Sequence, residues 1–236
     1  MNNLYIMAAV GLTTSLAMGD SIVPVDQTRY LEGYADFWDF DYGSDEDYGY
    51  VEAPDFDPFL ESLTVTAGWG VVAEATATQD SYILAEGIIA SGTAFGNAMF
   101  CNDTIFHGEA ESYLNVVFDL TSPVDISLTG TLWSNPQLGS AIASLSLYEG
   151  GVPILDFEAN ASEWQTELIE MNELISLQAG TYTLTAGAYA MGSSDGDYYE
   201  SESSFDFNMS VIPAPATLLP IAMGLAATRK KRRRTT

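Results

Sequence analysis

Alternation of apolar and polar residues limits the folds open to this chain more than any other feature. It recurs in residues 114–120, 124–132, 181–185 and 205–211. A period of two places successive side chains on opposite faces of a strand, one buried and one solvated. The apolar members are therefore predicted to fill a core: Leu114, Val116, Phe118, Leu120, Val124, Ile126, Leu128, Leu132, Tyr182, Leu184, Phe205 and Phe207.

Turn-forming residues separate the apolar runs. Examples are the pairs at residues 122–123, 150–151 and 179–180, which are Ser-Pro, Gly-Gly and Ala-Gly. Such pairs favour tight turns. Many short strands at this spacing indicate an all-β fold, and the sequence lacks the strand and helix alternation of a parallel sheet. Residues 62–211 are predicted to form an antiparallel β-sandwich, jelly-roll-like in character.

One segment within this region is ambiguous. In residues 162–174, Trp164, Leu168 and Met171 lie roughly on one face of a helix, whereas their alternation as strand residues is less tidy. The stretch that follows, residues 177–184, resembles the glycine-turn entry to a strand in bacterial jelly-roll modules. In those modules the preceding segment is usually a strand, so a strand is the prediction here too.

The N-terminal region has no clear period. Residues 20–61 hold 13 of the 33 acidic residues, and between Tyr34 and Tyr50 aromatic and acidic residues interleave without a clean repeat. Segments that bury little apolar surface stay unfolded. We interpret this region as a poorly ordered acidic arm that partly docks through its aromatic rings. A solvated linker and a calcium or carbohydrate contact region both remain open.

Charge is segregated along the chain. Its 33 acidic residues all precede one terminal run that holds six of the seven basic residues: Arg229, Lys230, Lys231, Arg232, Arg233 and Arg234. A folded domain has no need of this separation, whereas a membrane-sorting signal ends in a basic stop. The acidic body, with a sequence pI near 4.1, argues against nucleic acid as a partner because phosphates would be repelled.

The C-terminus has three parts. Pro213, Ala214 and Pro215 open it, an apolar stretch runs on to Thr228, and the basic run follows. This arrangement resembles the PEP-CTERM sorting signal of Gram-negative bacteria, with Ala214 at the position of the usual glutamate. The resemblance implies a C-terminal hydrophobic helix that an exosortase, a membrane-embedded processing enzyme, recognises. The apolar stretch is shorter than the ~20 residues of a spanning helix, which favours a processed signal over a permanent anchor.

The other end of the chain indicates export. Residues 4–18 form an apolar run, and Ala17 and Gly19 fit a small-residue cleavage pattern. A buried first strand or helix is the alternative. The expected organisation is a signal peptide at 1–19, the acidic arm at 20–61, the sandwich at 62–211 and the sorting signal at 212–236. The protein is expected at the cell surface or in the extracellular matrix, after transient anchoring in the inner membrane.

Catalytic motifs are absent from the sequence. Its one cysteine, Cys101, and its one histidine, His107, lie six residues apart without a recognisable nucleophile motif. No serine-hydrolase elbow, zinc-protease, phosphate-loop or dinucleotide signature occurs. We predict no catalytic residues and no enzyme activity.

Calcium is the only cofactor that the sequence suggests. Ca²⁺ takes six to eight oxygen ligands, and Asp45, Asp47, Asp195 and Asp197 lie in acidic segments that contain glycine, which we interpret as loops. Their spacing does not match an EF-hand. Solvated acidic loops are the alternative interpretation.

The expected function follows from the resemblance. It implies an exported structural or adhesive protein with an exosortase-type enzyme and extracellular polysaccharide as partners. The alternative is a secreted carbohydrate-binding or carbohydrate-active β-sandwich module. Trp38, Trp69, Trp133 and Trp164 are the candidates for stacking on sugars, although packing into the core is the commoner fate of tryptophan in a sandwich.

Overall fold

Twelve β-strands make up the part of the chain that the computed structural model describes, residues 22–41, 43–69, 72–101, 104–192 and 198–212. All strand pairs are antiparallel within these ranges, which confirms the all-β prediction. The strands are β1 (Ile22–Asp39), β2 (Gly43–Glu52), β3 (Phe59–Ala67), β4 (Ala73–Leu84), β5 (Gly87–Cys101), β6 (Thr104–Leu120), β7 (Val124–Pro136), β8 (Gly139–Glu149), β9 (Val152–Ala159), β10 (Glu167–Leu177), β11 (Gly180–Gly192) and β12 (Tyr198–Ile212).

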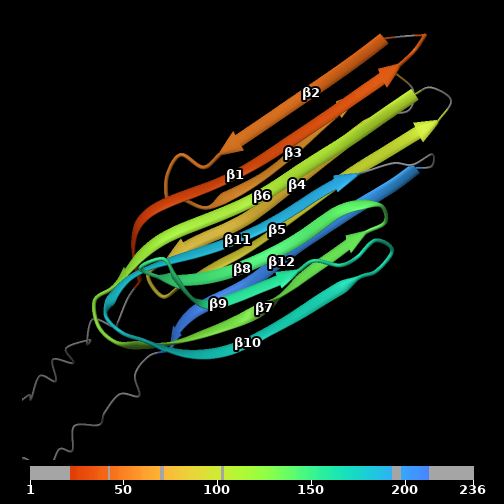
Figure 1. The fold of residues 1–236 in the computed structure, drawn as a ribbon. Coiled ribbons are helices and arrows are strands. Elements are labelled where there is room, and N and C mark those ends of the chain that lie inside the picture. Colours follow the sequence, from red (N-terminus) through yellow and green to blue (C-terminus); the bar gives the residue numbers. More distant parts are fainter. Residues whose placement is uncertain (1–21, 42, 70–71, 102–103, 193–197, 213–236) are drawn as a thin grey trace, which may run out of the picture.

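The strands form two layers with aligned directions (Figure 1). Sheet I has the order β3-β4-β5-β12-β7-β10, and sheet II has the order β2-β1-β6-β11-β8-β9. β1 packs across the layers on β3 and β4, and β8 packs on β12 and β7. The sheets join where the end of β5 turns into β6 and Ala98 pairs with His107. The molecule is therefore an aligned β-sandwich.

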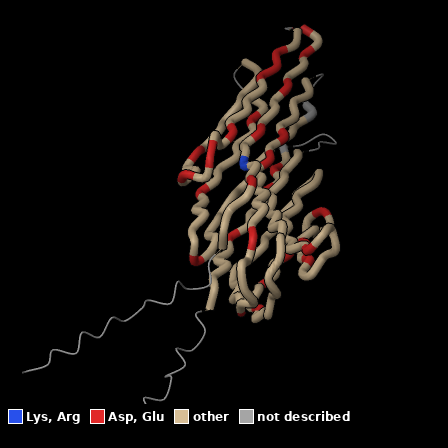
Figure 2. The backbone as a smooth tube through the Cα atoms, turned by 90° about the vertical axis from the view of Figure 1, so that its left-hand side faces the viewer, with Lys and Arg blue, Asp and Glu red and all other residues tan. Residues whose placement is uncertain are grey.

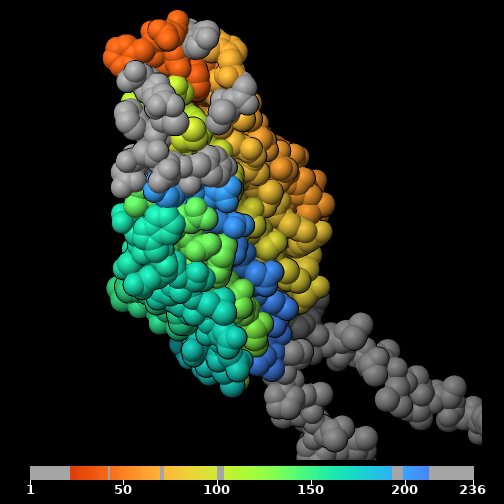
Figure 3. Space-filling view, turned by 90° about the vertical axis from the view of Figure 1, so that its right-hand side faces the viewer, coloured from red at the N-terminus to blue at the C-terminus, as the bar shows by residue number. Residues whose placement is uncertain are grey.

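Strands β5 to β12 alone have jelly-roll topology. The first of the eight pairs with the last, the second with the seventh, the third with the sixth and the fourth with the fifth. β4 and β3 extend sheet I beyond β5, and β1 and β2 extend sheet II beyond β6. Figure 3 shows the outer face of sheet I, on which blue β12 lies between the yellow and the green strands.

The predicted core is confirmed. All twelve side chains expected to point inward are buried, and the most accessible, Val124, is only 6% exposed. Each large apolar side chain taken out of water in this way contributes about 1.5–3 kcal/mol. Burial alternates strictly along β6 and β11, so the sequence period sets which face of each strand lies against the other sheet.

The acidic arm predicted for residues 20–61 is wrong. Residues 22–39 and 43–52 are the strands β1 and β2, paired with β6 and with each other. In β1 the inward positions include Gly33 and Ala35, whereas Tyr34 and Trp38 point outward. Large aromatic side chains on the solvent side conceal the alternation when hydrophobicity is read from sequence. In the described residues the sandwich therefore includes β1 and β2 and extends N-terminally of residue 62.

Of the remaining sequence predictions, some concern described residues and others do not. The strand predicted in residues 162–174 is confirmed from Glu167 onward as the start of β10. The signal peptide, the C-terminal hydrophobic helix and the sorting signal from Pro213 onward lie outside the described residues. In the described ranges, no helix is long and apolar enough to span a membrane.

Arg29 links β1 to the loop between β2 and β3 through hydrogen bonds. It is the sole Lys or Arg within the described ranges. It is 0% exposed. Its Nη2 donates to the carbonyl oxygens of Asp55 and Asp57, and its Nη1 donates to Ser81 Oγ at 3.1 Å. Burial lowers the pKa of Arg29, while Asp55 and Asp57 act in the opposite sense. The buried charge is thus satisfied mainly by carbonyl and hydroxyl oxygens.

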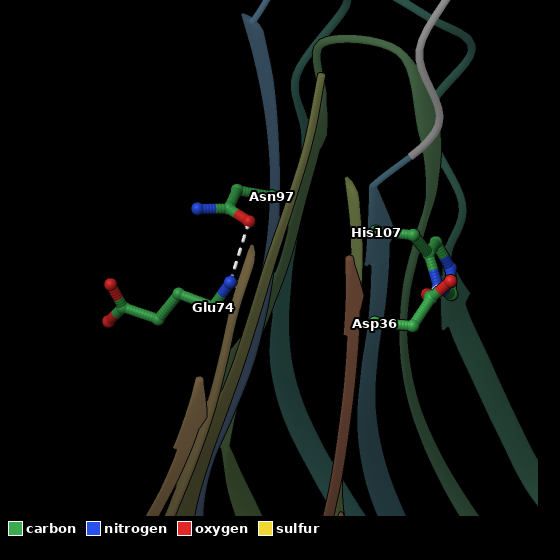
Figure 4. A network of polar contacts seen from close by, with 4 residues as sticks. All are labelled: Asp36, Glu74, Asn97 and His107. Atoms are coloured by element: carbon green, nitrogen blue, oxygen red, sulfur yellow. Dashed lines mark hydrogen bonds and ion pairs between the residues drawn. The ribbon is translucent and has the colours of Figure 1, made fainter. Parts of the chain in front are cut away.

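Close backbone contact fixes the corner where the sheets join. A Cβ on Gly108 would lie 2.1 Å from the Glu74 carbonyl oxygen, and one on Gly96 would lie 2.3 Å from the Gly108 carbonyl oxygen. Only glycine allows this approach. Asn97 Oδ1 accepts a hydrogen bond from the Glu74 N–H at 2.8 Å (Figure 4). The corner holds the start of β6, which carries His107, beside β1.

Candidate functional site

The outer face of sheet II over β2, β1, β6 and β11 carries an unusual set of side chains. Outward positions on these strands alternate with buried ones and hold mainly tyrosines and carboxylates. We call this set the tyrosine–carboxylate face, with these members: Tyr30, Glu32, Tyr34, Asp36, Glu46, Tyr48, Tyr50, Glu52, Glu109, Glu111, Tyr113 and Tyr189.

Strand register sets the pattern of this face. In one row across the strands, Tyr34 lies between Tyr48 of β2 and Glu109 of β6. In the next row, Glu32 lies between Tyr50 and Glu111. Side chains directly opposite each other on antiparallel strands are close enough to touch. Rings and carboxylates therefore alternate along β1, whereas across the strands Tyr34 lies beside the ring of Tyr48 and Glu32 lies beside the carboxylate of Glu111.

Two adjoining hollows lie on the face. The first, of about 310 Å³, is lined by Glu32, Tyr34, Tyr48 and residues 109–111. The second, of about 450 Å³, is lined by Tyr34, residues 36–38 and residues 44–46. Because Tyr34 lines both, the two hollows lie side by side over β1 and its two neighbours.

Ring contacts hold the tyrosines in place. The Tyr30 ring lies 5.5 Å from that of Tyr50 and 5.1 Å from that of Tyr113. Such pairs contribute about 0.5–1.5 kcal/mol beyond the area they bury. Tyr48 and Tyr50 remain 57% and 46% exposed. The ring of Tyr50 is thus held by a neighbouring ring and is still open to solvent.

Hydrogen bonds link the rings to the carboxylates. The Tyr30 hydroxyl donates to Glu111 Oε2 at 3.1 Å. Burial raises the pKa of Glu111, the hydrogen bond from Tyr30 lowers it, and the Glu32 and Glu109 carboxylates raise it. Burial also raises the pKa of Tyr189, and hydrogen bonding to Glu109 adds to that shift. Both shifts follow from negative charge held close together with partial loss of water.

At the end of the face nearest the turn from β5 to β6, His107 Nδ1 lies 3.1 Å from Asp36 Oδ1. The two side chains come from β6 and β1 and point toward each other (Figure 4). The His107 ring also lies 6.3 Å from that of Tyr34. His107 therefore borders the face and contacts two of its members, whereas the side chain of Cys101 lies outside what is described.

Negative charge dominates the whole described region. Figure 2 shows acidic positions in red on many strands and loops, with one basic position in blue, Arg29. Arg29 is fully buried and bonded to inward groups, so its charge does not reach the face. Within the described ranges, His107 is therefore the only ionisable base on this surface.

The proposed calcium ligands are not brought together in the described residues. Asp45 and Asp47 lie in strand β2 and not in a loop. Asp45 Oδ2 accepts from the Gly68 N–H at 3.0 Å, and Asp47 Oδ2 accepts from the Thr66 N–H at 3.4 Å. They cover the free edge of β3 in the opposite sheet. No group of three acidic, His or Cys side chains suited to a metal occurs in the described ranges. Asp195 and Asp197 lie outside those ranges, and calcium there stays a prediction.

None of the four tryptophans lies in the described core. Trp38 packs edge-on against Phe40, and Trp69 packs edge-on against Phe37. Trp133 is half-buried. The expectation that tryptophan would pack into the core is therefore wrong, because alanine, leucine and phenylalanine fill it instead.

Trp164 forms a second exposed aromatic position, in the loop between β9 and β10. It is 61% exposed, has a φ of 64° and lies 5.1 Å edge-on from the Tyr199 ring. A positive φ is unfavourable for a bulky residue. The hydrogen bond from its N–H to the Pro136 carbonyl oxygen, at 2.9 Å, fixes the turn that holds this conformation.

The sequence interpretation missed the tyrosines of the face. A signal was present, because Glu32, Tyr34, Asp36 and Trp38 occupy every second position of β1. That alternation marks one face of a strand once tyrosine is counted as a surface residue. The pairing of β1 with β2 and β6 places these side chains on one face, and no short sequence pattern predicts that pairing.

Comparison with known proteins gives only distant likenesses. No family model and no curated protein sequence matches the chain. Among solved structures, TmCBM61 in complex with β-1,4-galactotriose is 13% identical, with a TM-score of 0.26 over 50% of this chain and 82% of that one. The structure of infectious bursal disease virus, Gt strain, is 11% identical, with a TM-score of 0.26 over 84% of this chain and 58% of that one.

A third likeness is to the enzymatically active domain of bacteriophage CBA120 tailspike protein 4. It is 8% identical, with a TM-score of 0.25 over 64% of this chain and 19% of that one. Similarity this distant carries nothing about ligand or activity, so the function of this chain has to be argued from its own surface.

Proposed function

We propose that the chain is a carbohydrate-binding β-sandwich module and that the tyrosine–carboxylate face contacts the glycan. The observation that carries this proposal is the pair of adjoining hollows over β2, β1 and β6, in which exposed tyrosine rings stand between carboxylates. The proposal is of a binding role and not of an enzyme.

The chemistry of the face suits a sugar chain. A sugar ring has one apolar C–H surface and a rim of hydroxyl groups. Tyrosine offers a flat, rigid ring with a polar tip and loses little entropy on binding. An ionised carboxylate only accepts hydrogen bonds, so Glu32, Glu109 and Glu111 can accept from sugar hydroxyls. Concave sites with a few convergent polar groups are typical of small-ligand binding.

Binding of the full chain to a panel of soluble polysaccharides, measured by affinity electrophoresis and calorimetry, tests the proposal. The variant Tyr34→Ala/Tyr48→Ala removes the two rings of the first hollow. We expect at least one glycan to bind the parent and to lose about thirtyfold in affinity in this variant, equivalent to ~2 kcal/mol.

The matched control removes two rings from the other sheet. Tyr82 and Phe95 are half-buried at outward positions of β4 and β5, and Tyr82→Ala/Phe95→Ala should leave the affinity within about twofold. Equal losses in both variants, or no binding of the parent to any glycan in the panel, would rule out the face as a glycan site.

We further propose that the module is exported and sorted as the PEP-CTERM-like tail implies. The support is the order of Pro213, Ala214 and Pro215, a short apolar stretch and the basic run. A glycan-binding module delivered this way would serve as an adhesive component of the cell surface or the extracellular polysaccharide.

Processing is tested by the intact mass of the protein released from the producing cells. We expect both ends to be shortened, with residues 1–19 and Arg229–Arg234 absent. A released species that still ends at Thr236 would contradict sorting by an exosortase and leave a permanent anchor as the explanation of the tail.

A further inference from the structure

We propose that the glycan bound by the tyrosine–carboxylate face carries free, protonated amino groups, as a glucosamine polymer does. This inference rests on the proposed function and names its ligand class. The proposed ligand of the outer face of β2, β1 and β6 is a cationic sugar chain, because its charge complements the negative charge of that face.

Like charges lie directly opposite each other on this face. Glu32 of β1 is in register with Glu111 of β6, and Asp36 is in register with Glu46 of β2. Opposed like charges on neighbouring strands are destabilising. Two such pairs flank Tyr34, where they line the hollows. Features that oppose stability and gather in a depression are expected at functional sites.

No Lys, Arg or His within the described ranges forms an ion pair with Glu32, Glu109 or Glu111. Arg29, the one Lys or Arg there, is fully buried and donates to Asp55, Asp57 and Ser81. His107 is engaged by Asp36 at the end of the face nearest the turn from β5 to β6. Glu32, Glu109 and Glu111 therefore share the first hollow without a counter-charge from the described chain.

The hollow also presents rings to a cation. Tyr34 and Tyr48 line it with the three glutamates, and an ammonium group is attracted both by carboxylates and by the face of an aromatic ring. A neutral sugar would leave the opposed charges unrelieved. An anionic sugar, such as a uronic acid polymer, would add to the repulsion. An amino sugar gains from stacking and from charge at once.

The test compares two hexasaccharides that differ only in N-acetylation. Calorimetry at physiological ionic strength would measure the full chain with the glucosamine hexamer, at a pH where its amines are protonated, and with the N-acetylglucosamine hexamer. We expect the glucosamine hexamer to bind at least about tenfold more tightly. The variant Glu32→Gln/Glu109→Gln/Glu111→Gln should lose about that tenfold for the amine form, since three partly exposed ion pairs are removed.

A second triple variant controls for net charge. Glu61, Glu170 and Glu173 are exposed on strands of sheet I. Changing these three to glutamine removes the same charge elsewhere and should leave both affinities within about twofold. An equal loss in this control would mean diffuse attraction of a polycation by an acidic protein and would overturn the inference. Circular dichroism of both variants verifies that each retains the fold.

Other outcomes separate this inference from the proposed function. Equal, Tyr34- and Tyr48-dependent binding of both hexamers would overturn the amine specificity and leave the glycan site intact. Binding of neither hexamer, together with no binding in the polysaccharide panel, would remove both proposals. A peptide with the sequence of residues 229–234 serves as a third ligand. If it binds more tightly than the sugars and depends on the same two tyrosines, the face belongs to a basic peptide.

Discussion

The jelly roll of β5 to β12 and the extension of β1 to β4 use aromatic residues in opposite ways. In the jelly roll, Phe118, Phe205 and Phe207 point inward and are at most 1% exposed. In the extension, Tyr34, Tyr48 and Trp38 point outward, and alanines and glycines occupy many of the inward positions. The jelly roll thus buries its phenylalanine rings, whereas the extension buries Phe37 and Phe59 and exposes most of its tyrosine and tryptophan rings.

Small inward side chains allow the large rings of the extension to lie on its outer surface. A Cβ on Gly49 would lie 2.6 Å from Leu63 Cδ1 and 2.8 Å from Val65 Cγ1, so the inner face of β2 lies tightly on β3. Ala73, Ala75 and Ala77 fill the inner face of β4. Close packing of the two layers requires little volume there, which leaves the large side chains of the extension free for a binding surface.

The largest expected effect comes from a charge in the jelly-roll core. Val116→Asp or Leu128→Asp should unfold the protein, because an unpaired buried carboxylate costs several kcal/mol, on the order of the whole stability. Val117→Asp is the matched control, since Val117 lies at an outward, partly exposed position of the same strand. Near-ultraviolet circular dichroism would decide, and a native spectrum for both core variants would contradict the inward orientation.

Arg29→Met should also destabilise the protein strongly and should act on the extension. It leaves the carbonyl oxygens of Asp55 and Asp57 without their donor, at a cost of about 3 kcal/mol. Hydrogen exchange is expected to rise first in β1, β2 and β3, with β5 to β12 still protected. Uniform loss of protection would show instead that the two regions unfold as a single unit.

The sequence predicts the jelly-roll half of this comparison well and the extension poorly. Leu114 to Leu120 alternate with polar residues, so the period alone identifies the strand and its buried face. In β1, the run from Leu31 to Trp38 also alternates, but it places aromatic side chains outward, where a hydrophobicity reading expects polar ones. The period was present, and the assumption that large rings are buried hid it.

The candidate site could be predicted from the sequence even less well than the extension. Tyr34, Tyr48 and Glu109 come from three strands, and only the pairing of β1 with β2 and β6 brings them into one row. Pairing between strands distant in sequence depends on global topology. Likewise, composition predicted that Asp45 and Asp47 are calcium ligands in a loop. In the structure they accept hydrogen bonds from backbone N–H groups at the edge of β3.

A pair of ring deletions sharpens the comparison. Phe118→Ala should destabilise the protein by about 3–5 kcal/mol, because it leaves a cavity in the jelly-roll core. Tyr48→Ala should change stability by less than about 1 kcal/mol, because that ring is 57% exposed. Urea unfolding measures both. A Tyr48→Ala loss as large as that of Phe118→Ala would mean that the outward rings serve the fold and not a ligand.

The smallest expected effect concerns Glu111, where site and stability oppose each other. Its folded-state pKa is raised, mainly by burial and then by Glu32 and Glu109, against the hydrogen bond from Tyr30. A raised folded pKa means that the ionised form is less favourable in the folded state than in the unfolded chain. Stability from the neutral form is therefore complete below the unfolded pKa, ~4.3, and is lost as pH rises through the folded pKa.

Glu111→Gln should accordingly raise the melting temperature at neutral pH, by about 2 °C after allowance for solvent screening of a partly exposed group. Glutamine retains an acceptor for the Tyr30 hydroxyl, so the ring contacts should persist. The gain should vanish as pH falls below the unfolded pKa, where the parent is neutral too. Glu170→Gln, on the exposed face of β10, removes the same formal charge, and an equal gain there would trace the effect to net charge alone. Greater stability combined with weaker binding of the glucosamine hexamer would identify Glu111 as a residue that serves the ligand at the expense of the fold.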